Sequence, residues 1–144
     1  MEVSSGAWIA IAAVAIALAV GTYRLLTDGR FRGSTVEQAD DGPWSHIIRA
    51  LPEATAGERA TLVQFSSAFC APCRATRRVL GEVAEIVPGV THVEIDAEQH
   101  LELVRRLGIL RTPTTLVLDA AGGEVTRAAG APRKEQVLAA LGRA

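Results

Sequence analysis

The sequence is poor in the residues that build metal centres and has no surplus of charge of either sign. It contains two cysteines and three histidines in 144 residues, and the histidines lack the paired spacing of zinc ligands. Its 15 basic and 16 acidic residues give a net charge of −1, which leaves no basic face for a nucleic acid. We therefore expect neither a metal site nor a nucleic-acid partner. The length suits one domain with a core of its own.

The N-terminus carries a long stretch without charge. Residues 6–23 contain no ionised side chain, and eighteen helical residues at ~1.5 Å each would span ~27 Å, about the thickness of a bilayer's hydrocarbon core. Trp8 and Tyr23 lie near its two ends, where amphipathic rings favour the membrane interface. Arg24 can extend its charge outward, which lengthens the apolar segment to Leu26. We predict a transmembrane anchor helix over residues 6–26.

A cleaved signal peptide is the alternative, with Ala17-Leu-Ala19 as its cleavage site, but no basic residue precedes the apolar segment. Arg24, Arg30 and Arg32 follow it instead. The positive-inside rule then predicts a single-pass membrane protein whose C-terminal domain faces the cytoplasm. An extracytoplasmic domain is the competing orientation.

Residues 27–43 are polar and interrupted by glycine, which predicts a flexible linker with a reach of ~20–25 Å. Phe31 and Val36 could form a short edge strand within it.

Residues 44–144 alternate short apolar segments with amphipathic ones. Helices are expected at 44–51, 73–87, 98–107 and 133–141, and strands at 61–66, 90–96, 114–119 and 124–129. A turn at 120–123 would join the last two strands into a hairpin. This order predicts an α/β fold in which a mixed central sheet has helices on both faces.

The two cysteines lie together in Phe69-Cys70-Ala71-Pro72-Cys73, directly after the strand at 61–66. A strand–loop–helix order places both sulfurs in the first helical turn, where free N–H groups and the helix dipole favour a thiolate. Two intervening residues let the thiols close a disulfide with little backbone movement. So small a ring stabilises a fold very little, which favours a redox role. Inert core thiols or half of a zinc site are the alternatives.

These segments together resemble the thioredoxin family, over about residues 45–142. The matching stretches are Leu62-Val-Gln-Phe65 before Cys70-Ala-Pro-Cys73, then Val93–Asp96, Leu107–Thr114 and Asp119–Val125. The resemblance implies a thioredoxin fold and thiol–disulfide oxidoreductase activity, with no cofactor beyond a redox-active Cys70–Cys73 disulfide. It also implies that Cys70 is the nucleophile that forms a mixed disulfide, which Cys73 then resolves.

The resemblance assigns further residues to the site. Pro113 matches the family's cis-proline, and the backbone of Thr112 would pair with an extended substrate segment; a plain turn before a strand is the alternative for this dipeptide. Phe69, Ala71 and Pro72 are expected to support the active-site loop and its contact with substrate.

Two positions depart from the family pattern. Its buried acid corresponds to Gln64, which cannot take a proton, and the lysine that accompanies the acid corresponds to His92. An imidazole titrates near neutral pH, so His92 is a candidate for proton transfer, and an ordinary strand histidine is the alternative. Gln64 and His92 are therefore the expected neighbours of the dithiol, and they bear on its exchange rate and redox potential.

The favoured function is a membrane-tethered oxidoreductase that reduces or exchanges protein disulfides. Its expected partners are protein disulfide substrates, a thioredoxin-reductase-like or membrane electron donor, and lipid around the N-terminal helix. One alternative is a redox-sensing module that binds a membrane partner. Another is an outward-facing thioredoxin-like factor for maturation of cytochromes or envelope proteins.

Overall fold

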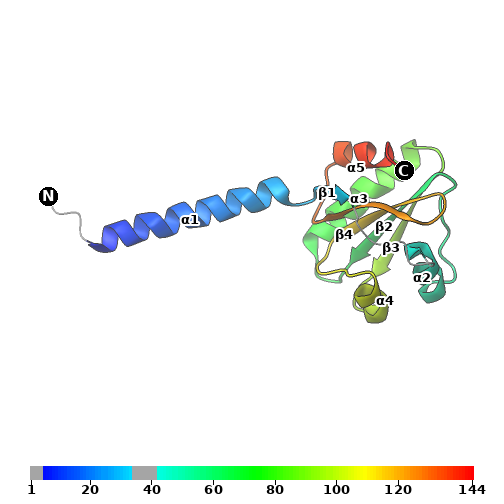
Figure 1. Cartoon of the computed structure of the whole chain (residues 1–144), viewed down its shortest axis with the longest axis horizontal. Helices are drawn as coiled ribbons and strands as arrows, with labels where there is room; N and C mark the ends of the chain where they lie inside the picture. Colours follow the sequence, from blue (N-terminus) through cyan, green and yellow to red (C-terminus); the bar gives the residue numbers. More distant parts are fainter. Residues whose placement is uncertain (1–4, 34–41) are drawn as a thin grey trace.

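The structure, a computed structural model, describes residues 5–33 and 42–144 (Figure 1). Its elements in chain order are α1 (Ser5–Thr27), β1 (Phe31–Gly33), α2 (Pro43–Ala50), β2 (Ala60–Ser66), α3 (Ala71–Ile86), β3 (Val90–Asp96), α4 (Leu101–Arg106), β4 (Thr114–Asp119), β5 (Glu124–Ala129) and α5 (Lys134–Leu141). The blue helix α1 projects away from the body that the other elements form.

Helix α1 contains the apolar segment that the sequence predicted as an anchor. Residues Trp8–Leu26 have a mean hydropathy of 2.1, and none of this segment is buried against the rest of the chain. Its length and composition would let it cross a membrane, although a signal sequence near an N-terminus has the same properties. It is therefore a candidate transmembrane span.

The strands form one mixed sheet in the order β1-β5-β4-β2-β3. Strands β2 and β3 run parallel, whereas β2 with β4, β4 with β5 and β5 with β1 are antiparallel. The interior strand β2, between β4 and β3, is buried along its whole length, as expected for a strand covered on both faces. In its register Gln64 lies between Glu94 of β3 and Thr115 of β4.

Helices cover both faces of the sheet, as predicted. Val63 and Phe65 belong to a core that contains Ile47 of α2 and Leu103 of α4. The alternate residues of β2 belong to the opposite core, with Leu80 and Val83 of α3 and Val137 of α5. The two-residue period of a strand thus divides its side chains between two cores.

The sheet begins inside the segment predicted to be a linker. Phe31 pairs with Ala128, and Gly33 with Thr126, so β1 covers the edge of β5. The side chain of Phe31 also packs against the core on the α3 and α5 face. Pairing satisfies the backbone groups that an edge strand would otherwise expose. The other part of the expected edge strand, Val36, lies outside the described residues.

Most element boundaries agree with the sequence prediction within one residue, but the starts of α3 and α4 differ by two and three residues. Helix α3 starts at Ala71, because Cys70 acts as its N-cap and Pro72 suits a first helical turn. Helix α4 starts at Leu101 rather than at residue 98. Asp96 holds the preceding turn by accepting hydrogen bonds from the Glu98 backbone N–H and the Gln99 side chain, which delays the helix.

Candidate active site

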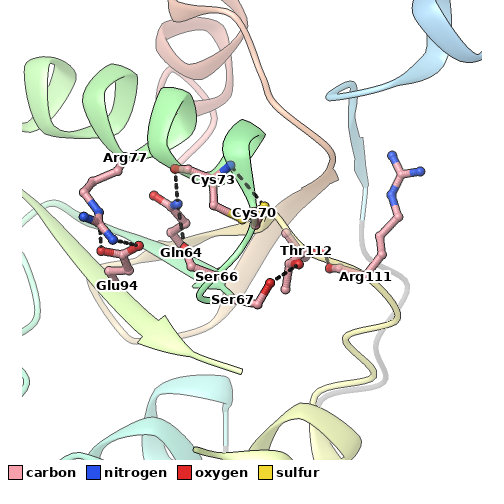
Figure 2. Close-up of a disulfide and its surroundings, with 10 residues drawn as sticks. Gln64, Ser66, Ser67, Cys70, Cys73, Arg77, Glu94, Arg111 and Thr112 are labelled. Atoms are coloured by element: carbon pink, nitrogen blue, oxygen red, sulfur yellow. Dashed lines mark hydrogen bonds and ion pairs between the residues drawn. A yellow bond between two sulfur atoms is a disulfide. The ribbon is translucent and has the colours of Figure 1, made fainter. Parts of the chain in front are cut away.

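Cys70 and Cys73 are joined by a disulfide at the start of α3 (Figure 2). Their Cα atoms lie 5.2 Å apart. The backbone N–H of Cys73 donates a hydrogen bond to the sulfur of Cys70 at 3.2 Å, so the helix N-terminus is directed at that atom. Cys70 is partly exposed, whereas Cys73 is only 2% exposed. This geometry stabilises negative charge on Cys70 once the disulfide opens, and it shields Cys73.

The loop that contains Pro113 lies beside the disulfide. The Thr112–Pro113 peptide bond is cis, as the family resemblance implied. The Thr112 hydroxyl lies 3.1 Å from that of Ser67, in the loop before Cys70, and this hydrogen bond ties the two loops together (Figure 2). Because the β4 pairings start at Thr114, Thr112 lies just outside the sheet ladder.

Two large apolar side chains project into solvent from these loops. Phe69, which directly precedes Cys70, is 99% exposed, and Leu110, in the loop that leads to Pro113, is 95% exposed. Ala71 and Pro72 at the start of α3 are exposed as well. The sequence identified Phe69 but not Leu110, because a lone leucine in a loop has no periodicity that indicates its exposure.

Gln64 lies directly beneath the first turn of α3 and is fully buried. Its Nε2 donates to the carbonyl oxygen of Cys73 at 2.9 Å and to the Ser66 hydroxyl at 2.8 Å (Figure 2). Its Oε1 lies 3.1 Å from Nε2 of His92. Since Oε1 can only accept, Nε2 of His92 carries the hydrogen. The structure therefore brings Gln64, His92 and Cys73 together, and every hydrogen-bonding atom of the Gln64 amide is used.

Electrostatics keep His92 neutral. Burial lowers the pKa of His92, the nearby Glu94 carboxylate opposes this shift, and the Arg77 guanidinium reinforces it. Glu94 is ion-paired with Arg77 of α3, with Nε of Arg77 2.5 Å from a carboxylate oxygen. Burial disfavours charged Glu94, but the hydrogen bonds from Arg77 and Ser66, together with the positive charge nearby, outweigh burial and hold its pKa below the ordinary value. At neutral pH a neutral imidazole and a stable ion pair thus adjoin Gln64.

A polar cavity of about 380 Å³ opens beside the disulfide. It is lined by Ser66, Ser67, Ala68, Cys70, Cys73, Arg74, Arg77, Glu94 and Asp96. Its charged lining was not predicted from the sequence, because α3 arginines and β3 carboxylates look like ordinary surface charges until α3 packs against β3. Within residues 5–33 and 42–144, no group of three or more His, Cys, Asp or Glu side chains is arranged to hold a metal ion.

The mixed sheet, the cysteine pair that starts α3 and the adjacent cis-proline define a thioredoxin-like oxidoreductase fold. A family model described as a thioredoxin-like domain matches residues 49–144. The chain belongs to the thioredoxin family. The match leaves residues 1–48, including α1, outside the family model.

Curated relatives and solved structures agree. The chain is 36% identical over 90 residues to a thioredoxin of Alicyclobacillus acidocaldarius, an alignment that covers 62% of this chain and 85% of that protein. It is 30% identical over 114 residues to thioredoxin H4-1 of Oryza sativa, covering 77% and 84%. The X-ray structure of Fasciola hepatica thioredoxin matches with a TM-score of 0.56 at 23% identity, covering 69% of this chain and 89% of that one.

Proposed function

We propose that this protein is a membrane-tethered thiol–disulfide oxidoreductase that reduces or exchanges protein disulfides. The observation that carries the proposal is the Cys70–Cys73 pair at the N-terminus of α3, where the Cys73 N–H is directed at the Cys70 sulfur. Membership of the thioredoxin family supports the same chemistry.

The reaction starts from the reduced dithiol. The Cys70 thiolate attacks one sulfur of a substrate disulfide, which forms a Cys70–substrate disulfide and releases the other substrate sulfur as a thiolate. Cys73 then loses its proton and attacks the Cys70 sulfur. This step forms the Cys70–Cys73 disulfide and releases the second substrate thiolate. Two electrons have passed from the dithiol to the substrate, and a dithiol or membrane electron donor must return them.

A buried carboxylate cannot remove the proton of Cys73 here, because Gln64 occupies the position of the family's buried acid. Gln64 holds the Cys73 carbonyl and cannot take a proton. His92 donates its Nε2 hydrogen to Gln64, so the amide lies between the imidazole and Cys73. Both cysteines line the 380 Å³ polar cavity. We therefore assign removal of this proton to water that enters the cavity.

The loops around the disulfide would bind an extended peptide. The backbone of Thr112, just beyond the β4 ladder, can pair with a substrate strand. Phe69 and Leu110 add exposed apolar contacts next to it. These features fit protein disulfides as substrates, and no part of the proposed mechanism needs a cofactor.

Helix α1 would tether the domain to a membrane. Arg24, Arg30 and Arg32 follow its apolar segment, which favours a domain that faces the cytoplasm. Reporters fused after Ala144 test this orientation, and a reporter that works only in the cytoplasm should be active. If only a reporter that works outside the cytoplasm is active, the result would instead support the role in envelope-protein maturation.

Catalytic turnover tests the redox proposal. The full-length protein in detergent, with dithiothreitol as electron donor, should reduce insulin, and a Cys70→Ser/Cys73→Ser variant should lose the catalysed rate. A redox-sensing module is the second candidate, and Gln64 favours it because an amide gives Cys73 no adjacent base. A protein that forms and opens its disulfide without accelerating insulin reduction would support the sensor and contradict the oxidoreductase.

A further inference from the structure

The segment directly after α1 contacts the loop that precedes Pro113. The Arg111 guanidinium hydrogen-bonds the carboxylate of Asp28, one residue beyond α1, and donates to the carbonyl oxygen of Ala129 at 2.8 Å. The Gly29 N–H donates to the same Ala129 oxygen at 2.9 Å. Figure 2 shows Arg111 on the side of the active site where the blue segment after α1 passes. The end of the candidate membrane helix is thus fixed to the redox domain.

A cavity of about 640 Å³ lies at this junction. Its lining includes four arginines, Arg24, Arg30, Arg111 and Arg133, and one carboxylate, that of Asp28. Asp28 is already paired with Arg111. Among the residues that the structure describes, no carboxylate forms an ion pair with the other three arginines. The cavity therefore concentrates positive charge that the described part of the chain does not neutralise.

Part of the cavity lining is apolar. Leu25 and Leu26 line it and are largely exposed, and both belong to the last turns of α1. The candidate span Trp8–Leu26 ends at this point. If α1 crosses a bilayer, the cavity lies at the level of the lipid headgroups. Its volume is within the ~300–1,000 Å³ of small-ligand sites.

We propose that this cavity binds the phosphate-bearing headgroup of an anionic membrane lipid. Guanidinium groups recognise phosphate oxygens through paired, charge-assisted hydrogen bonds. The leucines offer an apolar surface for the start of the acyl chains. Arg24 comes from α1 and Arg133 directly precedes α5, so a bound headgroup bridges the anchor and the domain. The bridge fixes the orientation of the Thr112–Pro113 loop relative to the bilayer. The proposal rests on the proposed membrane tether.

The test uses full-length protein in detergent, titrated with short-chain phosphatidylglycerol and followed by native mass spectrometry. The variant is Arg24→Gln/Arg30→Gln/Arg133→Gln, which leaves the Arg111–Asp28 contact in place. We expect the wild type to bind one lipid molecule per chain. Loss of three cationic contacts should weaken this binding roughly tenfold or more.

A matched control removes the same charge elsewhere. Arg78→Gln/Arg105→Gln/Arg143→Gln alters three exposed arginines outside the cavity. It should keep the affinity of the wild type within about twofold, because it leaves the cavity contacts intact. Equal weakening in both triple variants, or none in the cavity variant, would overturn the proposal.

Two further probes distinguish the source of the phosphate. Short-chain phosphatidylcholine, whose headgroup has no net charge, should bind roughly tenfold or more weakly than phosphatidylglycerol. Inorganic phosphate should not displace the lipid at matched concentration, and displacement there would overturn the lipid assignment.

Membrane anchoring is measured separately, as carbonate-resistant flotation of the protein with phosphatidylcholine vesicles. The redox function is measured separately as insulin reduction. Neither readout depends on the arginine cavity, so a lost lipid site remains distinguishable from both.

Discussion

Replacing Gln64 by aspartate tests whether this position controls the reactivity of Cys73. The wild-type amide holds the Cys73 carbonyl, the Ser66 hydroxyl and the His92 imidazole, and none of these contacts moves a proton to or from Gln64. A carboxylate at the same place could accept the proton of Cys73 during resolution. We therefore expect Gln64→Asp to accelerate disulfide exchange above the pKa of the new acid.

The gain should be modest and the structural cost clear. A well-placed base contributes ~10²–10⁴-fold in general, but a thiol is already acidic, so we expect at most about tenfold here. Aspartate loses both donor hydrogens of Gln64, whose two bonds contribute ~1 kcal/mol each, and burial of its charge adds to that loss. His92 can pair with the carboxylate. The hydroxyl of Thr115 can donate a hydrogen bond to the carboxylate as well. Thr115 lies cross-strand from Gln64, and its buried hydroxyl has no hydrogen-bond partner among the described residues. A destabilisation of ~2–4 kcal/mol is expected.

Two measurements are needed, each with Gln64→Asn as the control. Asparagine has the size of aspartate but no titrating group, so it separates the loss of length from the gain of a base. Between pH 6 and 9, Gln64→Asp alone should exchange disulfides faster than the wild type, whereas urea unfolding should show that both variants are destabilised. An aspartate variant no faster than the asparagine variant at every pH would refute proton transfer at this position. If neither variant is destabilised, the hydrogen bonds of Gln64 to Cys73, Ser66 and His92 do not stabilise the fold as we expect.

Three further predictions use other parts of the molecule. Cys73→Ser should trap mixed disulfides with substrate proteins, whereas Cys70→Ser should trap almost none; the reverse result would exchange the roles of the two thiols. Removal of residues 1–26 should leave a soluble, monomeric domain with unchanged thiol chemistry. Removal of residues 1–33 also deletes β1 and should lower the unfolding free energy by ~1–2 kcal/mol, because the half-buried Phe31 is lost. Because burial lowers the pKa of folded His92, the unfolded chain binds the proton first as the pH falls, so stability should decline below about pH 6.5. His92→Gln should flatten this decline in urea titrations, and an unchanged slope would assign it to another group.

Strong periodicity explains why the domain was largely predictable. The strands Val90–Asp96, Thr114–Asp119 and Glu124–Ala129 have the predicted limits, because each is a short segment rich in β-branched or apolar residues and bounded by turn residues. The CxxC after a strand likewise predicted the disulfide at a helix start. The β2–β3 register pairs His92 with Leu62, and its imidazole reaches the amide of Gln64 two residues further along β2. The sequence predicted both residues as neighbours of the dithiol but not their contact with each other.

Contacts that depend on tertiary structure were not predictable. The sequence offered Phe31 only as part of a possible short edge strand, because three residues are too few for a period-two pattern, and β1 forms by pairing with the edge of β5. Arg111 and Asp28 are 83 residues apart in the chain, and no local pattern connects them. Arg77 and Glu94 looked like separate surface charges, since only the packing of α3 on the edge strand β3 brings them together.

The groups around the dithiol predict an unusual pH dependence of exchange. Above neutral pH, Gln64 has no proton to exchange and His92, whose pKa is lowered by burial, is in its neutral form. Glu94 stays ionised, because the hydrogen bonds from Arg77 and Ser66 and the positive charge nearby outweigh its burial and lower its pKa. These three neighbours therefore keep constant charge while the thiols ionise. The rate of exchange with a small disulfide should rise once with pH and then level off, following the thiolate fraction alone. A second rise or fall in this pH–rate profile that disappears in His92→Gln would show that the imidazole takes part in proton transfer. Such a result would contradict the role assigned to His92, which is to stay neutral and hydrogen-bond Gln64.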